Sequence, residues 1–269
     1  MNSPATTYLS GCRSMLETVA AQTESIQQAA TWFANSILAG RVVHLFGAGH
    51  SRIMVEEMWP RYGSFPGFHP IVELSLTFHN LVTGANGQRQ AMFLETQSGL
   101  AERILRNFAL SANDSAMIVS SSGSNTVPIE MAQLFHAQGM KVVAIVSKLH
   151  CDASPSKHPD GVKLTEVADL VLDTGAPAGD ALVAIDGLPT PVSPGSTVGG
   201  CMLVNAIKAE VAAQLTAAGQ PPTVLTASCL VGPEVSRTMF EQAYDQHAWR
   251  VAKLYENVGR DESSASIDT

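Results

Sequence analysis

Short apolar segments alternate with helix-like segments along most of the 269-residue chain. Each apolar segment has the length of a buried strand, and the residues between carry apolar side chains at helical spacing. We predict strands at 42–46, 71–74, 116–120, 142–147 and 170–173. We predict helices at 52–62, 100–110, 128–138, 198–215 and 234–258. This alternation predicts an α/β fold with a doubly wound, five-stranded parallel sheet flanked by helices, and ligands at the carboxyl ends of its strands.

Two of the predicted strands end in loops of glycine and hydroxyl residues. The first loop runs from Phe46 to Ser51 and the second from Ser120 to Asn125. A predicted helix follows each loop, so backbone N–H groups and hydroxyls lie at a helix N-terminus, where a phosphate is favoured. A third hydroxyl-rich helix start lies near residue 196, and together these sites predict a phosphorylated small molecule as ligand. The residues expected to contact it are Gly47, Gly49, Ser51, Ser120, Ser121, Ser122, Gly123, Ser124, Asn125, Ser196 and Thr197.

The first loop also has features of a dinucleotide site. Gly47 and Gly49 supply a GxG turn between a strand and a helix, and Glu73 lies at a suitable distance for a ribose hydroxyl. Arg52, however, stands where the third glycine of that motif is expected. We therefore favour another phosphorylated small molecule over a nucleotide.

The net charge and the cysteine pattern exclude several classes of partner and of structural site. The formal net charge is -8, and no Lys/Arg cluster could neutralise a row of phosphates, so we expect no nucleic-acid partner. The four cysteines form no CxxC pair, which predicts neither a zinc ribbon nor a disulfide framework. We expect no signal peptide, and the sequence shows no apolar run near about 18 residues. We expect a cytoplasmic protein with no membrane partner.

The chain divides into three predicted parts. Residues 1–40 carry apolar positions at helical spacing and end at Gly40, so we expect N-terminal helices that pack on the core or on a second copy of the chain. Residues 41–258 form the α/β domain, and 259–269 form a disordered tail. The N-terminal helices and the last long helix exceed what a five-stranded sheet needs as cover. We therefore expect a homodimer or a higher homo-oligomer.

These motifs resemble those of the sugar isomerase (SIS) domain family. The resemblance rests on the GAGHS loop at 47–51, the serine loop at 120–125 and the GST helix start at 195–197, and it covers nearly the whole chain. More narrowly, the runs 125–132 and 179–181 are similar to the UPF0309 subfamily, which is related at a distance to phosphoheptose isomerases and N-acetylmuramic acid 6-phosphate etherases. The resemblance implies a flavodoxin-like three-layer sandwich that binds a phosphosugar with these loops. We expect no metal or organic cofactor.

Isomerisation of a sugar phosphate requires a group that removes a carbon-bound proton and returns it to the neighbouring carbon. A partly desolvated glutamate suits this task, with a histidine to help open the sugar ring. Arg61 stands where phosphoheptose isomerases carry their acid/base glutamate. Glu56 and Glu57 follow the first loop on adjacent helical positions about 100° apart, so at most one faces the site, and we predict Glu57. Glu73, near the carboxyl end of the second predicted strand, is the other candidate base.

Two histidines are candidate partners of these carboxylates. His50 lies inside the first loop, and His158 lies in a polar loop from which it could reach the sugar of a neighbouring subunit. His44 is predicted to be a hydrogen-bonded core residue. The sequence thus predicts an aldose–ketose isomerase. An etherase or deaminase-type lyase acting on an amino-sugar phosphate is the alternative enzyme, because both reactions begin by proton abstraction, and a non-catalytic phosphosugar sensor is the third possibility.

Overall fold

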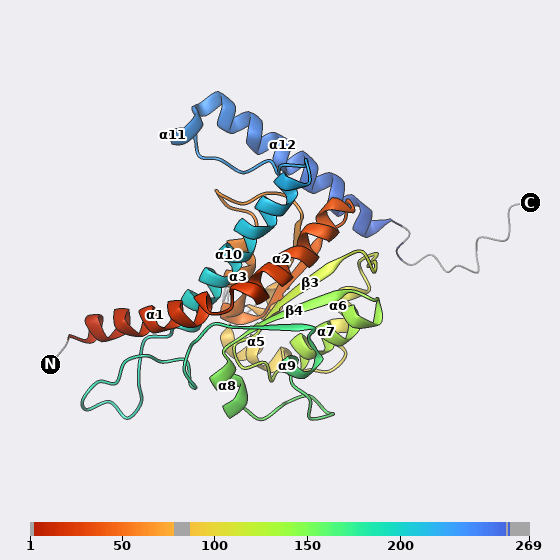
Figure 1. The fold of residues 1–269 in the computed structure, drawn as a ribbon. Helices are drawn as coiled ribbons and strands as arrows, with labels where there is room; N and C mark the ends of the chain where they lie inside the picture. The colour runs from red at the N-terminus through yellow and green to blue at the C-terminus, as the bar shows by residue number, and fades with distance from the viewer. Residues whose placement is uncertain (1–2, 78–86, 257, 259–269) are drawn as a thin grey trace, which may run out of the picture.

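A five-stranded parallel sheet lies between two layers of helices in the computed structural model, which describes residues 3–77, 87–256 and 258 (Figure 1). The strand order is β2-β1-β3-β4-β5, and every neighbouring pair is parallel. The predicted tail at 259–269 lies outside the described residues. The strands are β1 (Val43–Gly47), β2 (Phe68–Ile71), β3 (Ser115–Val119), β4 (Lys141–Val146) and β5 (Leu170–Asp173).

Helices cover both faces of this sheet, and short helices border its carboxyl edge. One face is covered by α2 (Thr23–Leu38), α3 (Arg52–Met58) and α10 (Ser196–Ala217). The other is covered by α6 (Leu100–Leu105), α7 (Thr126–Ala137) and α9 (Leu164–Val167). The remaining helices are α1 (Pro4–Ala20), α5 (Gln88–Leu94), α8 (Lys148–Ala153), α11 (Ser228–Val231), α12 (Pro233–Ala252) and the 3-10 helices η1 (Gly49–Ser51), η2 (Leu74–Leu76) and η3 (Lys253–Tyr255).

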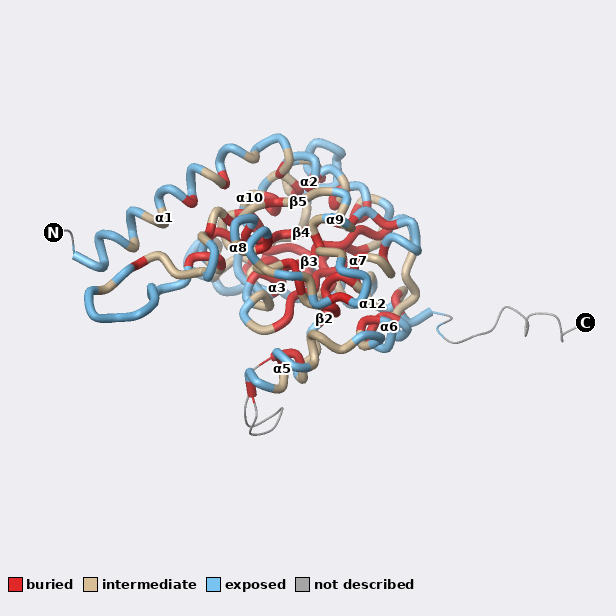
Figure 2. The backbone as a smooth tube through the Cα atoms, turned by 90° about the horizontal axis from the view of Figure 1, so that it is seen from below, coloured by how far each residue is buried: buried red, intermediate tan, exposed pale blue. Residues whose placement is uncertain are grey.

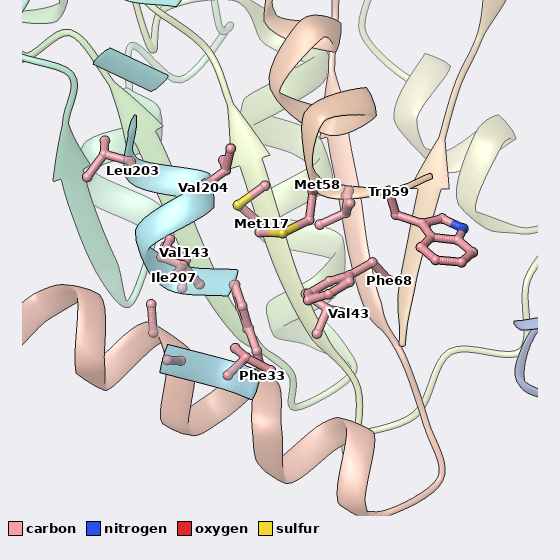
Figure 3. Close-up of a cluster of buried hydrophobic side chains, with 14 of the residues drawn as sticks. Phe33, Val43, Met58, Trp59, Phe68, Met117, Val143, Leu203, Val204 and Ile207 are labelled. Carbon is pink, nitrogen blue, oxygen red and sulfur yellow. The ribbon is translucent and has the colours of Figure 1, made fainter. Parts of the chain in front are cut away.

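Strand side chains alternate between two apolar cores because successive residues of a strand point to opposite faces. Met117 of β3 packs in one core with Phe33 of α2 and Ile207 of α10 (Figure 3). The next residue, Ile118, packs in the other core with Phe135 of α7. Both faces are buried, which explains why the strands read as continuous apolar runs in the sequence.

The predicted doubly wound, five-stranded parallel sheet is confirmed, with differences at element ends. The second strand is 68–71 rather than 71–74 and contains Pro70. Proline has no N–H for a sheet ladder, but β2 is an edge strand with a partner on one side only. The helix predicted to reach Tyr62 ends at Met58, since Trp59 precedes Pro60 and the residue before proline disfavours helical backbone.

The apolar run before residue 40 forms two helices, α1 and α2. Gln22 lies at the corner between α1 and α2, where its amide nitrogen donates to the Thr18 and Asp173 carbonyls. Its amide oxygen accepts from the Asp173 N–H at 2.7 Å. The corner is thereby tied to the end of β5. By contrast, α1 extends away from the body and buries only Met15 and Val19, so most of it is exposed (Figure 2).

A polar cluster is buried at the amino ends of the strands. His44 of β1 and His69 of β2 are paired through their Nδ1 atoms at 3.0 Å, which confirms His44 as a hydrogen-bonded core residue. Asp114 precedes β3, and its carboxylate receives two bonds from the Arg41 guanidinium at 2.8 and 2.7 Å. His44 Nε2 lies 3.4 Å from the same carboxylate.

No helix in the described ranges has the length and apolar character to span a membrane.

Candidate functional site

The strand order changes direction between β1 and β3. β2 lies on one side of β1, whereas β3 and the later strands lie on the other. The loops that leave β1 and β3 therefore diverge and leave a crevice at the carboxyl ends of these strands, the usual ligand position in such sheets. Gly47 pairs in register with Val119, so both predicted loops begin at this crevice.

A cavity of about 320 Å³ lies between the two loops, within the size range of small-molecule sites. It joins residues from both loops to residues of α5 and α8, which are distant in the sequence. The lining residues are Ala48, Gly49, His50, Ser51, Gln88, Ala91, Met92, Glu95, Val119, Ser120, Ser121, Ser122, Asn125, Pro128 and His150.

The first loop turns so tightly that it depends on glycine. A Cβ placed on Gly47 would lie 2.6 Å from the Ser51 carbonyl oxygen, closer than any real contact permits. Gly49 has a φ of 57°, in the left-handed region that favours glycine. The tight turn brings the backbone at positions 48–51 to the wall of the cavity.

The second loop is organised by its own serines. Ser124 donates from its backbone N–H and its hydroxyl to Ser122 Oγ, at 3.3 and 2.8 Å. Gly123 has a φ of 57°, and a Cβ there would lie 3.0 Å from the Cys151 sulfur. Ser121 Oγ is buried and has no hydrogen-bond partner among the described residues. A buried hydroxyl without a partner is costly, so this loop is suited to an added ligand oxygen.

Glu95 is the one carboxylate among the described residues that line this cavity. It follows α5, and its carbonyl oxygen accepts from the Val127 N–H at 3.0 Å, which fixes it beside the start of α7. Lys157 Nζ donates to Asn125 Oδ1 at 2.8 Å, and the Asn125 side chain also hydrogen-bonds with the Glu95 carboxyl. Burial raises the pKa of Glu95, and the bond from Asn125 and the charge of Lys157 only partly offset this effect.

Two histidines line the cavity among the residues that the structure describes. His50 was predicted to do so from its place in the first loop, whereas His150 was missed. His150 Nδ1 accepts a hydrogen bond from the Gly179 N–H at 3.0 Å. The signal that could have found His150 is its position soon after a predicted strand, at the same edge of the sheet as the two loops.

The predicted bases Glu57 and Glu73 are not among the described residues that line the cavity. Glu57 forms an ion pair with Arg61, and its Oε1 accepts from Asn205 Nδ2 of α10 at 2.7 Å. Burial alone would raise the pKa of Glu57, but the bonds from Asn205 and Arg61 outweigh it and lower the pKa. Glu73 lies beyond β2, directly before η2. The structure therefore brings neither carboxylate to the loops.

The third predicted anion site is occupied by the protein itself. Asp180 Oδ1 accepts from the Gly195 and Ser196 N–H groups at 3.0 and 2.7 Å, and Asp180 Oδ2 accepts from Ser196 Oγ at 2.6 Å. This carboxylate accepts the hydrogen bonds of the N–H groups at the start of α10, and Ser196 and Thr197 are not among the residues that line the cavity.

His158 is buried within its own loop, where Nδ1 accepts from the Asp160 N–H at 3.2 Å.

No group of side chains suited to a metal ion is present within the described part of the chain. The described residues that line the cavity carry hydroxyl, amide and carboxyl groups instead. The site combines hydroxyl and amide donors with one carboxylate of raised pKa. That combination can bind an anionic oxygen and move a proton.

Comparisons with known proteins show what this chain is similar to. A family model described as SIS domain matches residues 7–147. A UPF0309 protein of Thermoanaerobacter pseudethanolicus is 34% identical over 219 residues, covering 80% of this chain and 86% of the relative. A UPF0309 protein of Geobacillus thermodenitrificans is 32% identical over 220 residues, covering 81% and 86%. A solved phosphoheptose isomerase from Neisseria gonorrhoeae is 16% identical with a TM-score of 0.48, covering 77% of this chain and 95% of that one.

Proposed function

The chain belongs to the SIS domain family, and from this premise we propose that it binds a sugar phosphate between its two loops and isomerises it. The observation that carries the proposal is the meeting of Glu95 with the serine loop in one cavity. The partnerless hydroxyl of Ser121 supports a ligand oxygen at this loop. The raised pKa of Glu95, caused mainly by burial, supports proton transfer beside it.

Glu95 acts as the base on the open-chain form of the sugar. Its carboxylate removes the proton from C2 of an aldose phosphate, the C–H electron pair forms a C1=C2 bond, and the carbonyl pair moves to O1. This step gives an enediolate intermediate. The proton of the C2 hydroxyl then passes to O1, a carbonyl forms at C2, and Glu95 returns its proton to C1. The net result is a ketose phosphate, with the carboxylate restored.

Glu95 suits this role better than Glu57 because of its surroundings. An efficient general base has a pKa closer to the working pH than an ordinary carboxylate. The pKa of Glu95 is shifted in that direction, whereas bonds from Arg61 and Asn205 hold the pKa of Glu57 low despite its burial. The Asn125 side chain favours the charged form of Glu95 and so limits the rise of its pKa.

The protein works as a homodimer or higher homo-oligomer. Leu9 and Leu16 of α1 and Trp249 of α12 are each more than half exposed, at 64%, 51% and 56%. A second copy of the chain would bury these side chains. All four cysteines are free, in keeping with a reducing compartment such as the cytoplasm.

A thermal-shift titration tests the binding step. The ligands are glucose 6-phosphate, fructose 6-phosphate and arabinose 5-phosphate, with the free sugars and inorganic phosphate as controls. A sugar phosphate at about 100 times its dissociation constant should add about 2.7 kcal/mol to the free energy of unfolding. Ser122→Ala should weaken binding by about 1 to 3 kcal/mol through a lost bond to a charged group. Ser14→Ala, the same change on exposed α1, should leave it unaltered.

The outcomes of this titration and of product analysis separate the candidate functions. Equal stabilisation by free sugars would contradict phosphate recognition, and no stabilisation by any sugar phosphate would contradict the binding proposal. If a ligand binds, product analysis decides between isomerisation and elimination of an amine or ether substituent. Binding without any turnover would identify a sensor.

A further inference from the structure

His150 lines the cavity but has no part in the proton transfer assigned to Glu95. It lies on α8, which begins directly after Ser147 at the end of β4. Ser147 caps this helix: its Oγ accepts a hydrogen bond from the His150 N–H at 3.4 Å, which fixes the backbone of His150 at the helix start. The ring therefore reaches the cavity from a neighbouring strand rather than from either loop.

The hydrogen bond from Gly179 identifies which ring nitrogen carries the proton. A backbone N–H can only donate, so His150 Nδ1 accepts with its lone pair. In the neutral ring the proton is then on Nε2. No described group accepts from Nε2 in this structure. Nε2–H is consequently the donor that His150 has available for a ligand.

Gly179, whose N–H donates to His150 Nδ1, is followed by Asp180, which is hydrogen-bonded to the start of α10. Gly179 has a φ of 81°, and the next residue, Asp180, has a φ of 53°, which is uncommon for a residue other than glycine. Three hydrogen bonds from Gly195 and Ser196 to the Asp180 carboxylate hold that backbone. A negative charge is also favoured at this helix end. The Gly179 N–H is thus presented to His150 from a fixed position.

We propose that His150 donates a hydrogen bond from Nε2–H to the carbonyl oxygen of the bound sugar phosphate, and that Gly179 and Asp180 are positioning residues for this tautomer. The inference rests on the proposed function. As Glu95 removes the C2 proton, negative charge develops on O1, and a donor fixed beforehand stabilises that charge. A neutral imidazole does so without giving up its proton. The site would therefore prefer ligands with an oxygen anion or carbonyl at this point over polyol phosphates.

The first test examines the ring itself. Nitrogen-15 NMR of the wild-type protein, with His150 assigned by comparison with His150→Gln, should show a protonated Nε2 and an unprotonated Nδ1. Ser196→Ala removes one of the bonds to Asp180 and should weaken this tautomer preference. A proton found on Nδ1 would overturn the inference without any reference to activity.

The second test compares two ligands by calorimetry: a phosphorylated aldonohydroxamic acid, which mimics the enediolate, and the polyol phosphate of equal length. His150→Phe removes the donor and should lower affinity for the hydroxamate about 10- to 100-fold, while affinity for the polyol phosphate stays unchanged. His150→Gln, which retains an N–H donor, should recover part of the loss. His136→Gln, outside the cavity, should match the wild type.

The outcomes of the second test separate the inference from the proposed function. If the wild type binds neither phosphate ligand, the proposed function fails and the inference fails with it. If the wild type binds both and His150→Phe weakens neither, or weakens both equally, the sugar-phosphate site stands and the role of His150 is wrong.

Discussion

Lowering the pH from 7 to 5 should destabilise the protein through His69, which is buried between β1 and the ring of Phe108. Burial, aided by the neighbouring His44 and His247, lowers the pKa of His69 to about 3, and the Asp114 carboxylate offsets this only in part. Below the ordinary histidine pKa of about 6.5, the unfolded chain binds a proton at this residue whereas the folded protein does not. The stability that neutral His69 contributes is therefore lost as the pH falls from about 6.5 toward 3.

The size of this effect follows from the separation of the two pKa values. The titration of His69 should make the free energy of unfolding about 2 kcal/mol lower at pH 5 than at pH 7. The Asp114 carboxylate does not contribute in this range. Burial alone would raise its pKa, but bonds from His44 and Arg41 outweigh this and lower it, so its stabilising effect is lost only at more acidic pH. A loss of about 2 kcal/mol is a large part of the net stability of a typical domain.

Urea denaturation at pH 7, 6 and 5 measures this loss. His69→Gln keeps an N–H donor for His44 Nδ1 but cannot titrate, so its free energy of unfolding should fall by about 2 kcal/mol less than that of the wild type over this interval. His247 is also shifted downward by burial, and it remains in both proteins, so the difference isolates His69. Parallel pH dependence in the two proteins would refute the reasoning.

Three further predictions concern the first loop, the carboxylate of Glu57 and the formation of an oligomer. Gly47→Ala should abolish stabilisation by sugar phosphates in the thermal-shift assay, because its Cβ would lie 2.6 Å from the Ser51 carbonyl oxygen; normal binding would contradict the loop geometry. Glu57→Gln should leave turnover within about threefold of wild type, since it breaks an ion pair outside the cavity, and a loss above about 100-fold would restore Glu57 as the base. Leu16→Asp with Trp249→Asp should lower the mass seen by light scattering, and a wild-type monomer at micromolar concentration would contradict assembly through these helices.

The sequence predicted the sheet and the two loops well because both depend on local patterns. Buried parallel strands read as apolar runs, and tight turns before helices require small residues such as Gly47. The second strand was misplaced because Pro70 interrupts its pattern, and its edge position is visible only once the sheet is assembled. The start of α3 was also placed correctly, but sequence spacing could not show that Glu57 faces α10.

The parts of the site that depend on distant contacts were less predictable. Glu95 joins the serine loop through backbone and side-chain bonds to residues about 30 positions away, and no local pattern signals such a contact. The start of α10 has the hydroxyls of an anion site, yet Asp180, 16 residues before Ser196, supplies the anion. His150 carried a usable signal, since it closely follows a predicted strand at the ligand edge of the sheet.

Solvent-deuterium exchange tests the central claim most directly. With a sugar phosphate shown to bind, the wild-type protein in deuterium oxide should incorporate deuterium at the carbon beside the carbonyl. Glu95→Gln should bind that ligand with similar affinity but exchange about 10²- to 10⁴-fold more slowly, because the amide cannot accept the proton. Exchange by Glu95→Gln at the wild-type rate, or a wild-type protein that binds the ligand and never exchanges, would contradict the account.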